Sequence, residues 1–117
     1  MIKPVFLAAL AVTLAACATA PGPKHLTAQQ KRGQAFAKTH CAICHGIGRG
    51  DTSPNPESPP FEAVVNTIGL TAETLGTFLR DSHNYPGQMT FKIDAAKVDD
   101  LAAYMVTLKR ADYHPEI

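Results

Sequence analysis

The stretch Cys41-Ala42-Ile43-Cys44-His45 constrains this chain more than any other feature of its sequence. Two cysteines separated by two residues, with a histidine directly after the second, are typical of covalent attachment of a c-type haem. The spacing lets both thiols reach the two vinyl groups of one haem, and the adjacent histidine can supply one axial nitrogen to the iron. We therefore expect a protein that folds around one covalently bound haem.

Two other roles for paired cysteines have to be weighed against haem attachment. A structural zinc site needs four ligands, but only Cys17 remains as a further cysteine, and no second pair has the same spacing. A thioredoxin-like dithiol needs a strand–helix–strand context. The residues around Cys41 and Cys44 are instead typical of a helix and a glycine-rich loop, so the sequence favours haem attachment.

The length and charge of the chain fit a small cofactor-bound domain. Its 117 residues correspond to one domain, and a domain of this size buries only a limited core unless a cofactor adds to it. The 11 basic and 10 acidic residues nearly balance, so the sequence does not indicate binding of nucleic acid. No segment alternates apolar and polar residues as a strand does, and we expect an all-α fold.

The first residues are typical of an export signal. A short positive region is followed by the apolar run Pro4–Ala16, which is too short to span a bilayer. The residues that end at Cys17 resemble the lipobox of bacterial lipoproteins, where cleavage precedes a cysteine that then carries a lipid. Cleavage after Ala20, which would give a soluble periplasmic protein, is the alternative. The expected organisation is a signal peptide at 1–16, a tether at 17–26 and one domain at 27–117.

Apolar spacing and capping residues predict four helices. Thr27 and Gln30 form a capping box, and Thr71 and Asp94 are further candidates for helix caps. Residues 46–60 contain so many glycines and prolines that we expect a loop there. The predicted helices cover residues 28–39, 62–66, 71–81 and 95–110.

Residues 26–110 together resemble a class I cytochrome c, a small bacterial protein with one haem. Gly33 precedes the haem motif within the first helix, with Phe36 close behind it. In this family the N-terminal helix crosses the C-terminal helix through such a glycine. The resemblance therefore implies that Gly33 and Phe36 pack against Leu101 and Tyr104, in a fold of three to four helices wrapped around the haem.

The resemblance also implies that Met89 is the second axial ligand, because the family presents a methionine from a proline-containing loop before the last helix. A thioether is a soft ligand that favours ferrous iron. His83 is the alternative, and it would give a bis-histidine site. Met105 has a spacing typical of a buried helix face, so we expect it to be a packing residue. Thr90 departs from the family, in which many members have proline after the methionine.

Further haem contacts are implied for the loop after the motif. In the family a proline carbonyl accepts the proton of the other ring nitrogen of the proximal histidine, which here is His45. Pro59 fits this role best, although simple rigidity of the loop would also explain it. Phe61 would then pack on the haem. Arg49 could pair with a haem propionate or extend into solvent.

These features imply a periplasmic single-electron carrier that is not an enzyme, with redox proteins docking at the haem edge and a lipid anchor at Cys17. An electron-transfer subunit of an exported dehydrogenase or oxidase is the first alternative. A haem-based ligand sensor is the second, and it would need a labile Met89. Co-purification of a partner would distinguish the subunit, and carbon monoxide binding would distinguish the sensor.

Overall fold

The structure is a computed structural model that describes residues 25–81 and 92–114. Those ranges contain helices and loops but no strand, as the sequence predicted. None of their helices is long and apolar enough to cross a membrane. The predicted signal peptide, Cys17 and the loop with His83 and Met89 lie outside the described residues. The elements are α1 (Ala28–His40), α2 (Phe61–Val65), α3 (Ala72–Asp81), α4 (Ala95–Met105) and the 3₁₀ helix η2 (Val106–Leu108).

The predicted capping box begins α1. The hydroxyl of Thr27 accepts the backbone N–H of Gln30 at 3.2 Å, and the Gln30 side chain accepts the N–H of Thr27 at 2.8 Å. These bonds satisfy two of the donors that a helix start leaves without partners. Because α1 ends at His40, it delivers the chain directly to the first cysteine of the haem motif.

The caps of the later helices agree less well with the prediction from the sequence. Thr71 accepts the N–H of Thr74 through its hydroxyl at 3.2 Å, as a helix cap does. Asp94 occupies the N-cap position of α4, but its side chain forms no capping hydrogen bond. The short helix α2 begins at Phe61, one residue before the predicted start.

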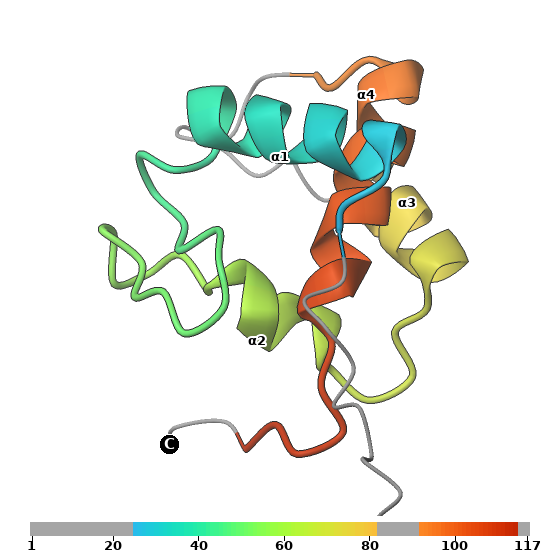
Figure 1. The fold of residues 1–117 in the computed structure, drawn as a ribbon. Helices are drawn as coiled ribbons and strands as arrows, with labels where there is room; N and C mark the ends of the chain where they lie inside the picture. The colour runs from blue at the N-terminus through green and yellow to red at the C-terminus, as the bar shows by residue number, and fades with distance from the viewer. Residues whose placement is uncertain (1–24, 82–91, 115–117) are drawn as a thin grey trace, which may run out of the picture.

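The crossing of α1 over α4 is the main helix contact of the fold (Figure 1). A Cβ atom built on Gly33 would lie 1.9 Å from the carbonyl oxygen of Asp100 and 2.9 Å from Cβ of Tyr104. Only glycine allows this approach, because any side chain would collide with the backbone of α4. The predicted contact of Gly33 with Tyr104 is thus present, but the nearest atom belongs to Asp100 rather than to Leu101.

The prediction that the last helix continues to about residue 110 is wrong. The α-helix ends at Met105 and tightens into η2, after which Lys109 is extended. The hydroxyl of Thr107 donates to the carbonyl of Tyr104 at 2.6 Å, in competition with the regular helical pattern. Arg110 leaves the helix, and its backbone N–H donates to the side chain of Asn66 at 2.9 Å.

The hydrophobic core lies between the four helices α1–α4 and the haem motif. Met105 is buried in it, as expected for a packing residue. Phe78 lies three residues after the buried Leu75 in α3, but it is 46% exposed. The largest fully buried side chains are those of Leu75, Leu101, Met105, Val65 and Val98.

Candidate haem site

The haem motif forms one turn directly after α1. The backbone N–H groups of Cys44 and His45 both donate to the carbonyl of Cys41, at 3.0 and 2.9 Å. In such a turn, residues three and four apart lie on the same side of the chain. The turn therefore brings both cysteines and the histidine to one side, in agreement with their expected use on one cofactor.

The two cysteines differ in their surroundings. Both thiols are free, but Cys41 is buried in the core whereas Cys44 is partly exposed. Burial, and secondly the neighbouring Cys44, raises the pKa of the Cys41 thiol to about 11. A redox-active dithiol depends on a lowered thiol pKa, so this environment argues against the thioredoxin-like alternative.

The zinc alternative also finds no support in the described ranges. No group of three or more His, Cys, Asp and Glu side chains within residues 25–81 and 92–114 could hold a metal ion. The thiols of Cys41 and Cys44 are therefore without the companion ligands that a structural zinc site requires in this part of the chain.

The imidazole of His45 is oriented by the loop that follows it. Its Nδ1 atom lies 2.8 Å from the carbonyl oxygen of Pro59, which is the contact implied by the resemblance to class I cytochromes c. Because a carbonyl can only accept, this hydrogen bond requires the proton on Nδ1. The lone pair of the neutral ring is then on Nε2, where it can bind a metal.

The side chain of Phe61 packs beside the imidazole of His45. It is buried, and its ring centroid lies 5.6 Å from that of the His45 imidazole. Its backbone N–H donates to the carbonyl of Gly46 at 2.8 Å. Phe61 therefore packs on the histidine, and its contact with the haem stays a prediction.

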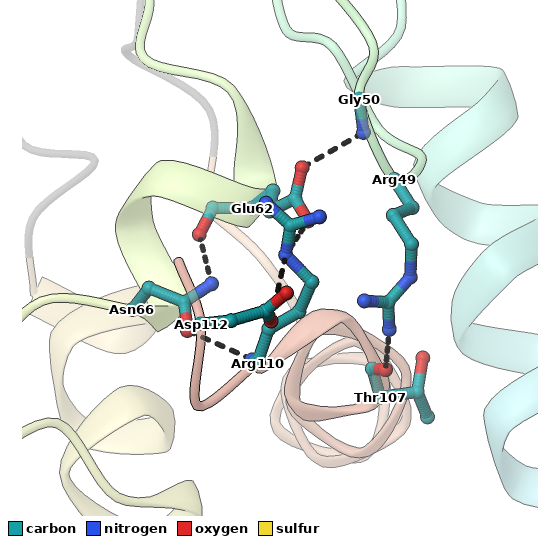
Figure 2. Close-up of polar contacts among 7 residues, drawn as sticks. All are labelled: Arg49, Gly50, Glu62, Asn66, Thr107, Arg110 and Asp112. Atoms are coloured by element: carbon teal, nitrogen blue, oxygen red, sulfur yellow. Dashed lines mark hydrogen bonds and ion pairs between the residues drawn. The ribbon is translucent and has the colours of Figure 1, made fainter. Parts of the chain in front are cut away.

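Two side chains connect the loop after the motif to the C-terminal helices. Arg49 is exposed and donates through Nη2 to the carbonyl of Thr107 at 3.1 Å, a bond that the sequence did not indicate, and its pairing with a haem propionate stays a prediction (Figure 2). The hydroxyl of Tyr104 donates to the carbonyl of Ile47 at 2.9 Å. The two bonds hold the loop against η2 and against the end of α4.

Sequence reasoning missed one residue near this site, the buried acid Glu62. Its carboxylate contacts Gly50 in the loop and Arg110 in the C-terminal segment. No local signal could have revealed this burial, because an acidic residue in the first turn of a helix is ordinary.

The residues present fit a c-type haem. The motif supplies two free thiols on one turn, and next to them an imidazole whose Nε2 is available to iron. Helices and loops surround this turn, and no strand occurs in the described ranges. The fold and the site together define a c-type cytochrome domain.

Comparison with known families leads to the same class. The family described as cytochrome c oxidase, cbb3-type, subunit III matches residues 28–105, and the chain belongs to this family. A covalent c-type haem and electron transfer are accordingly the cofactor and the function of the domain. The searches of curated proteins and of solved structures gave no significant match.

Proposed function

We propose that this protein is a single-electron carrier on the periplasmic face of a bacterial membrane, with one haem held by Cys41 and Cys44 and ligated by His45 and Met89. The observation that carries the proposal is the 2.8 Å contact between Nδ1 of His45 and the carbonyl of Pro59. When bound, the haem supplies one-electron exchange at its iron.

Each proposed ligand has a distinct task. The thiols of Cys41 and Cys44 would hold the haem as thioethers, and Nε2 of His45, whose ring is oriented by the carbonyl of Pro59, would be a nitrogen donor to its iron. The thioether of Met89 favours the ferrous state. Two strong axial ligands leave no position for a substrate, so we propose electron transfer without an enzymatic activity of the chain itself.

A second candidate is an electron-transfer subunit of an exported oxidase. The printed description of the matching family, subunit III of a cbb3-type cytochrome c oxidase, favours this alternative. Detergent extraction of native membranes followed by size-exclusion chromatography separates the two candidates. A free carrier elutes at the size of the single chain, whereas a subunit elutes with a larger haem-containing complex.

The test of the ligand set is an optical spectrum of the holoprotein, matured in an export host, in both oxidation states. We compare the unmodified protein with Met89→Ala and His83→Ala, and use Met105→Ala as the control for loss of a methionine elsewhere. A far-red iron–sulfur band that disappears only in Met89→Ala supports His45/Met89 ligation. A pyridine complex of the denatured protein reports whether the haem is covalently attached.

Other outcomes would redirect the proposal. A low-spin spectrum that changes only in His83→Ala indicates a bis-histidine site. A high-spin spectrum with carbon monoxide binding to the unmodified reduced protein indicates a ligand sensor. Absence of covalent haem in the unmodified protein would contradict the whole assignment.

A further inference from the structure

The carboxylate of Glu62 is a buried charge that the proposed haem ligation does not use. Its residue is 5% exposed, and Oε2 accepts the backbone N–H of Gly50 at 2.8 Å. Oε1 lies 3.1 Å from Nε of Arg110, as a charge–charge contact rather than a hydrogen bond (Figure 2). Burying a carboxylate is unfavourable unless it is paired, so these two partners account for its presence here.

Glu62 directly follows the residues that contact the proximal histidine. The carbonyl of Pro59 accepts from His45, and the N–H of Phe61 donates to Gly46. The bond from Gly50 to Glu62 adds a third link between the start of α2 and the loop after the haem motif. Gly50 adopts a φ of 71°, a left-handed conformation that suits glycine and turns the loop there.

The other end of α2, at Asn66, is connected to the C-terminal segment. The side-chain amide of Asn66 donates to the carbonyl of Glu62 at 2.8 Å, and its oxygen accepts the N–H of Arg110 at 2.9 Å. Figure 2 shows the loop, α2 and the segment after η2 meeting around the Glu62 carboxylate. Removal of that carboxylate therefore weakens the connection of α2 to both neighbours at once.

We propose that Glu62 is a positioning residue for the axial histidine. By fixing the start of α2 against the loop, it holds the Pro59 carbonyl on Nδ1 of His45. A weaker Nδ1–H bond makes the imidazole a poorer donor to iron, and a poorer axial donor alters the reduction potential. This inference rests on the proposed function, because it takes His45 as an axial ligand.

The experiment uses two variants whose charge changes are opposite. Glu62→Gln removes the negative charge, and Arg110→Gln removes the positive charge of its partner, whose side chain is 33% exposed. Glu57→Gln makes the same chemical change as the first variant at an exposed position of the loop and serves as the control. Exchange of the His45 Nδ1 proton with solvent is measured by NMR in the reduced holoprotein, and the reduction potential is measured by equilibrium titration.

Positioning by Glu62 predicts that proton exchange becomes about tenfold faster in both Glu62→Gln and Arg110→Gln, as for a loss of about 1.4 kcal/mol in the free energy of local opening. Exchange in Glu57→Gln stays unchanged. If Glu62 acted only through its charge, exchange of the His45 Nδ1 proton would stay unchanged in both variants. The reduction potential would then shift in opposite directions in Glu62→Gln and Arg110→Gln. That result would overturn the proposal.

The two proposals fail in different ways. A wild-type spectrum without His45 ligation would overturn the proposed function and this inference together. A normal wild-type spectrum with unchanged exchange in the variants would overturn only the role of Glu62. If Glu62→Gln yields no folded holoprotein, Arg110→Gln, which leaves the buried carboxylate without its charged partner, decides the question.

Discussion

The guanidinium of Arg32 holds the carboxylate of Asp100 by two hydrogen bonds, at 2.9 Å from Nε and 2.8 Å from Nη2. This two-point geometry is the strongest form of such a pair. Arg32 is next to Gly33 in α1, and the carbonyl of Asp100 is the atom that Gly33 faces in α4. The ion pair therefore lies beside the closest approach of the two helices, and its hydrogen bonds lower the pKa of Asp100.

The Arg32–Asp100 pair predicts that the difference in stability between the wild type and Asp100→Asn depends on pH. Because the folded pKa of Asp100 is lowered, the stabilisation is fully present above the unfolded value of about 3.9 and is lost as the pH falls through the lower folded value. We expect Asp100→Asn to lower the free energy of unfolding at neutral pH and to approach the wild type in acid. Denaturant titrations of the holoproteins across this range measure the difference.

The matched control for this prediction is Asp99→Asn. Asp99 is the neighbouring carboxylate on α4, with a side chain 66% exposed and only a 3.8 Å contact to Arg80. It should differ little from the wild type at any pH, because exposed pairs contribute little. If Asp100→Asn lowers the free energy of unfolding by the same amount at neutral and acidic pH, the prediction is contradicted.

The helix crossing predicts opposite results for two glycine-to-alanine substitutions. Gly33→Ala should reduce the free energy of unfolding by about 1–3 kcal/mol, because the new methyl group meets the backbone of α4. Gly76→Ala in α3 meets only the side chain of Arg80, at 3.7 Å or more, and should be neutral or slightly stabilising. Chemical denaturation of both holoproteins measures the effect, and equal stabilities would show that the crossing is looser than described.

The hydrogen bond from Tyr104 to the carbonyl of Ile47 predicts that removal of the Tyr104 hydroxyl destabilises the fold. Tyr104→Phe should lower the free energy of unfolding by about 1 kcal/mol, because a partly buried carbonyl loses its donor. Tyr113→Phe is the control, since the contact of Tyr113 with the guanidinium of Arg110 involves its ring, which phenylalanine keeps. The same small change in both variants would mean that the Tyr104 bond contributes nothing measurable.

The lipobox-like segment predicts where the mature protein is found. We expect mass spectrometry of the wild type to show a lipid on Cys17, and Cys17→Ser to move the protein from the membrane fraction to the soluble fraction. The haem spectrum should not change, because Cys17 takes no part in the proposed attachment. A mature wild-type chain that begins after Ala20 and carries no lipid would establish the soluble alternative.

The start of α1 could be predicted from the sequence because it depends on neighbouring residues. The capping box of Thr27 and Gln30 requires only residues three apart, and the structure shows both of its hydrogen bonds. The end of the last helix could not be predicted in this way. Beyond that end Arg110 bonds to Asn66, the C-cap residue of α2, which lies 44 residues away in the sequence.

The polar contacts of the loop also depend on remote residues and could not be predicted from the local sequence. Arg49 is exposed, but no local pattern indicated its bond to the carbonyl of Thr107. The burial of Glu62 had no local signal either, because it results from the loop and the C-terminal segment closing on α2. Both contacts join residues that are remote in the sequence, and only packing brings them together.

The sequence by itself determined the chemistry of this protein. Two thiols and an imidazole at the spacing of Cys41, Cys44 and His45 specify the cofactor class, because covalent attachment depends on residue type and local spacing. Only the tertiary structure decided which way the imidazole faces. Nδ1 of His45 meets the carbonyl of Pro59, 14 residues further along the chain, and that contact depends on packing between segments that the sequence keeps apart.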